Sequence, residues 1–282
     1  MGIFARFPNG LKKVLVFSYD DGVRQDRKLV EIFNKYGVKC TFNISSGLFD
    51  KEYHPELSKG RMSLKEAKEL YLNTGHEIAV HGLYHEEQLL LKDSQLVNEI
   101  RQDRENLENF TGGMVRGMAY PYGKVDDRVE ACARLCGIVY GRTAVSTHNF
   151  TLPSNWLRLN VTCHHDDEKL PELCNIFLEK DTTRFGHSRL FYIFGHGYEF
   201  DLDTTRQNFD TFEEYVKRLA NREDVWYATT IELYDYIKNF NDLIVSADGK
   251  KVYNPTSVPI WFWETPTHNE YVIMPNETIE LK

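Results

Sequence analysis

Hydrophobic and polar positions alternate along the first 240 residues in a pattern that predicts strands separated by helices. Short apolar runs typical of buried strands occur at 14–19, 40–44, 76–80, 115–119, 138–143, 190–194 and 225–228. Between them, apolar residues recur at helical spacing over 24–36, 63–75, 93–110, 125–136, 166–178, 209–220 and 230–240. This alternation is typical of a parallel sheet wrapped by helices. We therefore expect an α/β fold, a distorted (β/α) barrel of seven or eight parallel strands.

Two of the predicted helices carry clear end signals. Ser63 is followed three residues later by Glu66, which predicts a capping box at the start of the second helix. Gly37 follows the last apolar position of the first helix and predicts a C-terminal cap in the left-handed conformation.

The pattern changes after Asn241. Short apolar segments separated by prolines replace the helices, and Asp248-Gly249 is a hairpin signal. We expect a barrel over residues 1–240 and a small antiparallel β appendage over residues 241–282. Trp261 and Trp263 in this region could stack on a sugar ring, or they could seal the appendage against the barrel, which we favour.

Charge and cysteine content narrow the classes of partner. The chain of 282 residues has a net charge of −8, which disfavours nucleic acid or an anionic membrane as a partner. Five cysteines form no paired framework, so we expect buried free thiols in a reducing compartment. No stretch approaches the ~20 apolar residues of a membrane span, and the first eight residues lack the apolar core of a secretory signal. We therefore expect a cytoplasmic protein.

Polar side chains with catalytic potential follow several predicted strands directly. They are Asp20, Asp21, His81, Tyr120, Tyr122 and His196. In a β/α barrel the carboxyl ends of the strands share one face, where active sites lie. We expect these side chains to lie close together.

A metal site is the simplest interpretation of the first of these residues. By itself Asp20-Asp21-Gly22 is typical of a solvated turn. Adjacent carboxylates repel, however, unless a cation or a proton resolves the conflict. His81 and His85 are four residues apart, so on one helical turn they could hold the same metal ion. Adding Asp21 gives a two-histidine, one-carboxylate set with positions left open for water and substrate, and Asp20 beside it could act as a base.

Four segments together resemble a known family. Residues 18–22 (Ser-Tyr-Asp-Asp-Gly) resemble the Thr-Phe-Asp-Asp-Gly motif of the polysaccharide deacetylases, carbohydrate esterase family 4. Residues 81–85 (His-Gly-Leu-Tyr-His) resemble its His-Ser/Thr-x-x-His motif. Arg116 with residues 120–123 (Tyr-Pro-Tyr-Gly) resembles its Arg-x-Pro-Tyr motif, and residues 194–196 (Phe-Gly-His) resemble its Leu-x-Leu-His motif. The segments occur in the family's order and span roughly residues 14 to 235.

The resemblance implies a metal centre. Asp21, His81 and His85 would bind a divalent ion, for which Zn²⁺ is our first expectation and Co²⁺, Ni²⁺ and Mn²⁺ are alternatives. The expected reaction is removal of an acetyl group from the nitrogen or oxygen of a sugar by a water that the metal activates. An acetylated sugar or oligosaccharide of the N-acetylglucosamine type would be the substrate.

The resemblance also implies four catalytic roles. Asp20 would be the general base and His196 the general acid. The backbone N–H near Tyr122 would stabilise the oxyanion of the tetrahedral intermediate, and Arg116 would orient or neutralise Asp20.

Three departures from the family pattern affect these expectations. Gly82 replaces the Ser or Thr between the histidines. Arg116 lies five residues before Pro121 instead of two, so Tyr120 or Arg142 could take its place beside Asp20.

The third departure concerns the family's Asp-x-x-Asp-Trp motif, which has no clean match here. In the family this motif adjusts the acidity of the acid histidine. The candidates for this role are Asn155-Trp156, Asp166-Asp167 and Glu199. We expect residues 164–167 (His-His-Asp-Asp) to form a polar loop.

Two other functions remain open on the sequence. One is hydrolysis of a cyclic amide or imide on the same fold, sometimes without a metal. The other is carbohydrate binding by a protein of this fold without turnover.

Overall fold

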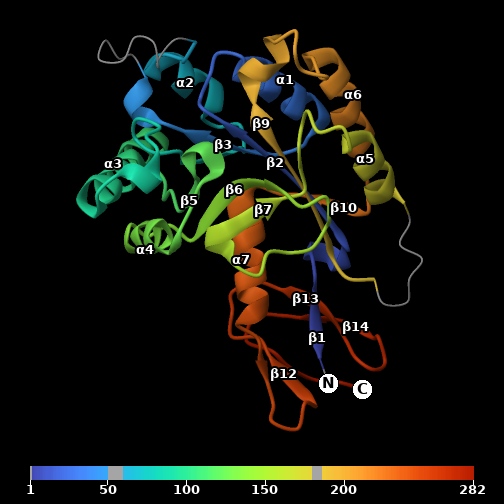
Figure 1. Cartoon of the computed structure of the whole chain (residues 1–282). Coiled ribbons are helices and arrows are strands. Elements are labelled where there is room, and N and C mark those ends of the chain that lie inside the picture. The colour runs from blue at the N-terminus through green and yellow to red at the C-terminus, as the bar shows by residue number, and fades with distance from the viewer. Residues whose placement is uncertain (1, 50–59, 180–185) are drawn as a thin grey trace.

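The computed structural model describes residues 2–49, 60–179 and 186–282, and its centre is a parallel sheet that curves into a distorted (β/α) barrel (Figure 1). The expected fold class is confirmed. The neighbouring strands run in the order β7-β6-β5-β4-β3-β2-β9-β8, and β10 pairs with the start of β2. The barrel strands are β2 (Lys13–Asp20), β3 (Cys40–Ile44), β4 (Glu77–Val80), β5 (Gly117–Ala119), β6 (Tyr140–Ser146), β7 (Leu159–Val161), β8 (Cys163–His164), β9 (Arg189–His196) and β10 (Val225–Tyr227).

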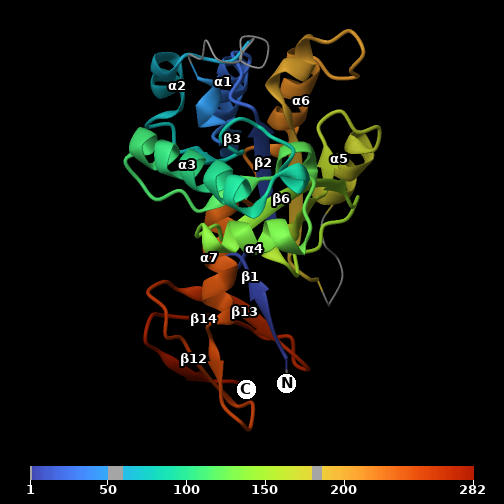
Figure 2. The ribbon, with the colours of Figure 1, turned by 60° about the vertical axis from the view of Figure 1, so that its left-hand side comes forward.

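Helices cover the outside of this sheet (Figures 1 and 2). The capping box of Ser63 and Glu66 is present at the start of α2, and Gly37 ends α1 with a φ of 65°, as predicted. The helices are α1 (Asp26–Tyr36), α2 (Leu64–Tyr71), α3 (Asp93–Thr111), α4 (Asp127–Leu135), α5 (Leu170–Leu178), α6 (Phe209–Leu219) and α7 (Thr230–Asn241). Single 3₁₀ turns are η1 (Pro8–Gly10), η2 (Ser46–Leu48), η3 (Gln88–Leu90), η4 (Pro121–Gly123), η5 (Trp156–Arg158) and η6 (Gly197–Asp201).

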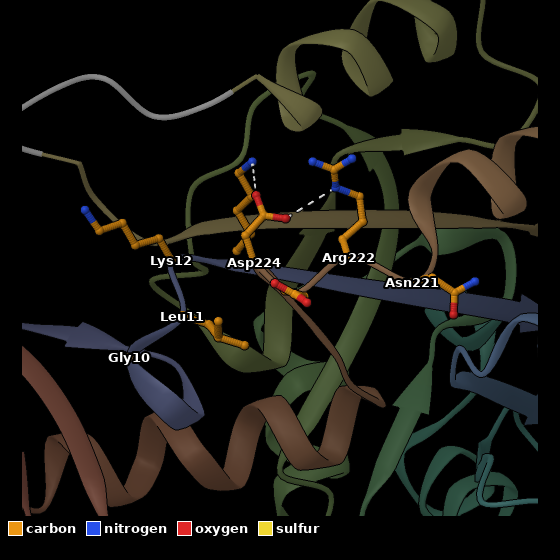
Figure 3. A pocket seen from close by; sticks show the side chains of 8 residues that line it. Gly10, Leu11, Lys12, Asn221, Arg222 and Asp224 are labelled. Carbon is orange, nitrogen blue, oxygen red and sulfur yellow. Dashed lines mark hydrogen bonds and ion pairs between the residues drawn. The ribbon is translucent and has the colours of Figure 1, made fainter.

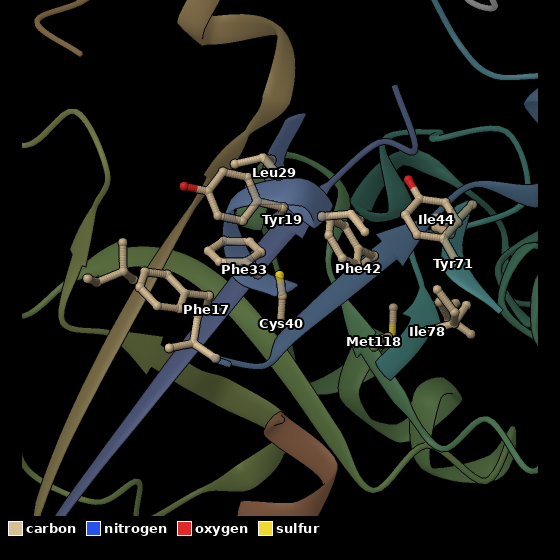
Figure 4. Close-up of a cluster of buried hydrophobic side chains, with 14 of the residues drawn as sticks. Phe17, Tyr19, Leu29, Phe33, Cys40, Phe42, Ile44, Tyr71, Ile78 and Met118 are labelled. Atoms are coloured by element: carbon tan, nitrogen blue, oxygen red, sulfur yellow. The ribbon is translucent and has the colours of Figure 1, made fainter. Parts of the chain in front are cut away.

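The main core lies between the sheet and its helices (Figure 4). Phe17 of β2 packs on Phe33 of α1 with ring centroids 4.9 Å apart, and Phe42 of β3 packs on Tyr71 of α2 at the same distance. Burying an aromatic or aliphatic side chain of this size contributes roughly 1.5–3 kcal/mol. All five cysteines are buried and none is in a disulfide, as predicted.

The residues after α7 form two small antiparallel sheets, and the first strand of the chain joins one of them. One sheet has the order β1-β13-β14 and the other β11-β12-β15. The strands are β1 (Ile3–Arg6), β11 (Ile244–Val245), β12 (Lys251–Tyr253), β13 (Ile260–Glu264), β14 (Glu270–Ile273) and β15 (Thr278–Glu280). The predicted hairpin at Asp248-Gly249 joins β11 to β12.

This appendage lies at the end of the barrel where β2 begins, and both chain ends lie in it (Figures 1 and 2). Tyr236 of α7 joins the two parts, because its hydroxyl donates to the carbonyl of Arg6 and accepts from the N–H of Trp261. Trp263 is buried and stacks on Phe4 with centroids 4.6 Å apart. Trp263 therefore packs against β1, inside the appendage.

Candidate active site

The predicted site residues meet at the carboxyl end of the barrel. Asp20 is the last residue of β2, and it is opposite Asn43 of β3 on one side and His196 of β9 on the other. His81 directly follows β4, the next strand beyond β3. Parallel strands that end together place their last side chains on one face, so the clustering expected from the sequence follows from the register.

Asp20 is buried and held by two side chains. Asn43 Nδ2 donates to its Oδ1 at 2.8 Å, and the guanidinium of Arg142 forms an ion pair with its Oδ2. Burial is the largest single effect and would raise the pKa of Asp20, but the charge and hydrogen bond of Arg142, together with His81 and His196, lower the pKa below the ordinary value. The carboxylate is therefore ionised at neutral pH and able to accept a proton.

Arg116 does not reach Asp20, although the sequence predicted that contact. Its guanidinium forms two hydrogen bonds with Asp235 of α7, at 3.0 and 2.6 Å. Arg116 precedes β5, whereas Asp20 ends β2, so the two lie at opposite ends of the barrel strands. Arg142 of β6, one of the two alternatives seen in the sequence, occupies the place beside Asp20. The other alternative, Tyr120, instead donates its hydroxyl to the carbonyl of Leu157.

Asp21, His81 and His85 present three ligand atoms to one point. The Nε2 atoms of His81 and His85 lie 3.8 and 3.7 Å from Asp21 Oδ1, and all three atoms are within 4.8 Å of one another. This is the set that the sequence predicted for a metal ion.

The tautomer of His81 fits a metal ligand. Its Nδ1 lies 2.9 Å from the carbonyl of Ala119, which can only accept, so Nδ1 carries the proton and the Nε2 lone pair is free. That buried Nε2 has no hydrogen-bond partner among residues 2–49, 60–179 and 186–282. Burial lowers the pKa of His81 to about 4, so the ring is neutral, as metal binding requires.

Arg61 adds a positive charge on the same side. Its Nη1 lies 3.0 Å from Asp21 Oδ1. Burial is the largest single effect and would raise the pKa of Asp21, but Arg61 and the neighbouring histidines together bring the pKa to about 2. Asp21 is therefore ionised and can offer a carboxylate oxygen to a cation.

Asp103 of α3 supports the loop that carries the two histidines. One of its oxygens accepts from the backbone N–H of His81 at 3.0 Å, and the other accepts from the N–H of Ser46 at 2.8 Å. Sequence analysis missed this residue, because a single aspartate inside a long charged helix gives no signal.

His196 faces Asp20 with one nitrogen and Glu199 with the other. Its Nε2 lies 3.8 Å from Asp20 Oδ2, and its Nδ1 lies 3.2 Å from Glu199 Oε2. Burial lowers the pKa of His196, but the hydrogen bond with Glu199 and the charge of Asp20 outweigh it and raise the pKa to about 9. The ring is therefore protonated at neutral pH and can donate a proton.

Glu199 is the only one of the three candidate partners that lies beside His196. Asn155 caps η5, and Trp156 packs on Tyr234. Asp167 pairs with His148, and Asp166 accepts from the backbone N–H of Gln207.

Two exposed tyrosines flank these groups. The ring of Tyr122 lies 4.8 Å from that of His85, and the ring of Tyr198 lies 5.3 Å from that of His196. Asp21, His85 and Tyr122 all have positive φ values, of 85°, 58° and 59°. Three of the nine non-glycine residues with positive φ in the described part of the chain therefore lie at the candidate site, a kind of place where strained backbone is common.

A surface hollow of about 610 Å³ lies elsewhere, at the start of β2 (Figure 3). Lys13 and Arg222 in its lining both contact Asp224. The hollow is separated from Asp20 by the eight residues of β2, about 25 Å of strand. It is therefore distinct from the site at the carboxyl end.

A comparison with family models found a match within the first half of the chain. Residues 8–141 match the model of the polysaccharide deacetylases. The matched part makes up a little less than half of the chain. It contains β2 to β5 and with them Asp20, Asp21, His81, His85 and Tyr122. A comparison with curated proteins found no match.

Solved structures of polysaccharide deacetylases and carbohydrate esterases share the fold. A protein from Mycobacterium smegmatis assigned to the polysaccharide deacetylases aligns over 85% of this chain and 95% of its own, with a TM-score of 0.58 and 14% identity. The Xyl-CE4 domain of a multidomain xylanase from the hindgut metagenome of Trinervitermes trinervoides aligns over 80% and 92%, with a TM-score of 0.50 and 17% identity.

A family 4 carbohydrate esterase from Streptomyces lividans, solved in complex with acetate, aligns over 76% of this chain and 91% of its own, with a TM-score of 0.50 and 12% identity. Among the described residues, none of the helices has the length and apolar character needed to cross a membrane.

Proposed function

We propose that this protein is a metal-dependent deacetylase that hydrolyses the acetamide or acetyl ester of a sugar or oligosaccharide, with N-acetylglucosamine units as the first candidates. The convergence of Asp21, His81 and His85 on one point, beside a separately held base and acid, is the observation that carries this proposal. The similarity of residues 8–141 to the polysaccharide deacetylase family supports the same reaction class.

Asp21, His81 and His85 would hold the divalent ion, with Zn²⁺ as the first expectation. The ion would lower the pKa of a water and polarise the acetyl carbonyl. Two neutral imidazoles and one carboxylate suit Zn²⁺, and Co²⁺, Ni²⁺ and Mn²⁺ accept the same ligands.

Asp20 and His196 would divide the proton transfers. Asp20 is ionised and would take the proton of the attacking water, while Arg142 and Asn43 keep its carboxylate in place. His196 is protonated and would give its Nε2 proton to the leaving amine or alcohol. Because the two groups lie 3.8 Å apart, both can reach one tetrahedral centre.

The turn that holds Tyr122 would stabilise the developing oxyanion. Backbone N–H groups in the first turn of a helix have no partner within the helix, and Tyr122 lies in the short turn η4 (Pro121–Gly123). The exposed rings of Tyr122 and Tyr198 would stack on sugar rings on either side of the bond to be cleaved.

The test measures metal content and acetate release on the same samples. Purified protein is assayed for bound metal and for acetate released from chitooligosaccharides. We expect about one divalent ion per chain and measurable acetate release, and Asp21→Asn and His81→Gln should lose both. His148→Gln is the control, because His148 is a histidine paired with a carboxylate outside this set.

Other outcomes separate the alternatives. Metal and sugar binding without acetate release would indicate a carbohydrate-binding protein. Hydrolysis of a cyclic imide without acetate release would indicate the second enzymatic alternative. Unchanged metal content in both variants would refute the metal assignment.

A further inference from the structure

A second group of histidine and carboxylate side chains adjoins the candidate acid. His164, His196 and Glu199 bring their ligand-type atoms within 4.8 Å of one another. β8 pairs with β9, and His164 is opposite Phe194, two residues before His196. Glu199 lies in η6, the turn that directly follows β9. The sequence predicted a polar loop at 164–167, but the sheet brings His164 to the candidate active site.

One oxygen of Glu199 is the centre of this group. Its Oε2 accepts from the backbone N–H of His196 at 2.9 Å and lies 3.2 Å from His196 Nδ1. His164 Nε2 approaches the same oxygen at 3.1 Å. One backbone hydrogen bond and two imidazole nitrogens at ion-pair distance therefore meet at one carboxylate oxygen.

The backbone fixes which nitrogen of His164 carries its proton. The N–H of Asp166 donates to His164 Nδ1 at 3.1 Å, so Nδ1 is unprotonated. A neutral imidazole then has its proton on Nε2. His164 therefore carries its proton on the nitrogen that lies 3.1 Å from Glu199 Oε2, where it can donate to that oxygen.

This tautomer argues against a second metal ion in the group. A metal on His164 Nε2 would require the proton to move to Nδ1, and that proton would face the N–H of Asp166. One hydrogen bond would be replaced by a repulsive contact between two donors. The geometry favours a chain of hydrogen bonds over a metal site.

The surroundings explain why Glu199 needs an anchor. A glutamate side chain has three free torsions, and fixing it costs up to about 2 kcal/mol of conformational entropy. Glu199 remains 18% exposed, so burial does not fix it. His165 lies next to Glu199 and is fully buried between the rings of Tyr19 and Phe200. His165 Nε2 is 3.6 Å from Glu199 Oε2, which is too long for a strong hydrogen bond.

We propose that His164 is a positioning residue for catalysis, which holds Glu199 so that its carboxylate orients the ring of His196 with Nε2 toward Asp20. The proposal rests on the deacetylase function proposed above. In this role His164 need not touch the substrate or the metal set. Its effect passes through Glu199 to the acid.

Two variants of His164 separate the hydrogen bond from the bulk of the ring. His164→Leu removes the donor and keeps a similar volume, while the amide of His164→Gln can donate near the place of Nε2. We expect His164→Leu to lower kcat for acetate release about 10- to 100-fold, with KM within threefold, as for other residues that orient a catalytic group. His164→Gln should recover most of kcat. His148→Leu is the matched control and should leave kcat unchanged.

Two outcomes would overturn the proposal in this assay. Equal loss of kcat in His164→Gln and His164→Leu would show that the hydrogen bond is not what matters. A second bound metal ion in the wild type that is lost in His164→Leu would show a metal site. Melting temperatures of the variants separate a catalytic loss from unfolding.

A measurement without turnover distinguishes this proposal from the deacetylase function. Long-range ¹H–¹⁵N correlation spectra of the ¹⁵N-histidine-labelled protein report the tautomer of each ring. We expect His164 with its proton on Nε2, and we expect the signals of His196 to shift in His164→Leu. A proton on Nδ1 of His164 would contradict this proposal alone, whereas absence of acetate release from the wild type would contradict the proposed function.

Discussion

Arg142 of β6 and Asp20 of β2 form a buried ion pair across the interior of the barrel. Three strands, β5, β4 and β3, separate β6 from β2 in the sheet. Both side chains are almost fully buried, and Arg142 also lies over the ring of Phe194 at 4.7 Å. The pair therefore connects opposite walls of the barrel directly beneath the candidate metal site.

Removing the arginine should damage both stability and activity. Arg142→Met leaves a buried, uncompensated carboxylate, so we expect the free energy of unfolding to fall by about 3–5 kcal/mol. The pKa of Asp20 should rise, and acetate release at neutral pH should be lost. Urea unfolding followed by tryptophan fluorescence and an acetate assay measure the two effects.

Arg116→Met is the matched control for that substitution. Arg116 and Asp235 are both partly exposed, and pairs of this kind contribute about 1 kcal/mol or less. We expect activity within twofold of the wild type. A larger loss of activity in Arg116→Met than in Arg142→Met would contradict this assignment. It would support the role beside Asp20 that the sequence suggested for Arg116.

Glu199 should set the acidity of His196. Replacing it by Gln removes a negative charge from Nδ1, so the His196 pKa should fall from about 9 toward or below its ordinary value of 6.5. The NMR titration of His196 in metal-free protein measures this shift. In the pH–kcat profile, the decline on the alkaline side should begin at a lower pH in Glu199→Gln. Asp167→Asn, which removes a carboxylate from His148, should leave the His196 titration unchanged.

Gly82 should resist replacement by the serine that the family pattern has there. Its φ is 78°, a conformation that costs residues with a side chain about 1–2 kcal/mol. The space around it is adequate, because an added Cβ would meet Pro121 Cγ at 3.4 Å. We expect Gly82→Ser to lower the free energy of unfolding by about 1–2 kcal/mol and to weaken metal binding through His81.

Gly113→Ser is the control for this strain. Gly113 is exposed, has an ordinary φ, and an added Cβ there would meet only Thr111 Oγ1, at 3.9 Å. Urea denaturation and a metal titration compare the two variants. Equal effects in both would show that the backbone conformation of Gly82 carries no special cost.

The titration of Asp26 should make the protein less stable as the pH rises from 3.8 to about 8. It is fully buried, and its Oδ2 accepts a hydrogen bond from the hydroxyl of Tyr71 at 2.6 Å. Burial raises its pKa from 3.8 to about 8. The folded state therefore keeps a proton that the unfolded state releases above pH 3.8. The stabilisation is complete below pH 3.8 and is lost by pH 8.

The slope of this loss is about 1.4 kcal/mol per pH unit for one proton. Asp26→Asn keeps the shape and removes the titration. The unfolding free energies of metal-free wild type and variant are measured from pH 6 to 9. Up to pH 8, the difference between them should change by about this amount for each pH unit. Parallel pH dependences would show that Asp26 is ionised in the folded protein.

The sequence predicted the barrel and the metal set because both depend on local patterns. Apolar runs identify the strands, and residues that directly follow strands must lie at one end of a parallel sheet. Asp21 and His81 follow from that argument. His85 was found by its spacing from His81, although residues 81–85 form a loop and not the helical turn that the spacing suggested. His164 was missed because it ends a strand of two residues, too short to show a period.

Contacts between distant strands could not be predicted in this way. The partner of Asp20 depends on which arginine reaches across the barrel interior, and this follows from sheet order, not from spacing along the chain. The same limit applies to Arg116, whose partner Asp235 is 119 residues away. Positive φ at Asp21, His85 and Tyr122 was also invisible, because none of the three is glycine.

The pairing of β1 with β13 has a consequence for how the protein is made. Ile3 is paired with Glu264, so β1 cannot pair until a strand more than 250 residues later has been synthesised. At about 5–20 residues per second, a ribosome needs on the order of tens of seconds to reach that partner. During this interval Phe4 and the neighbouring edge of β1 lack their partner strand. A nascent chain of this protein should therefore depend on chaperones until the last sheet closes.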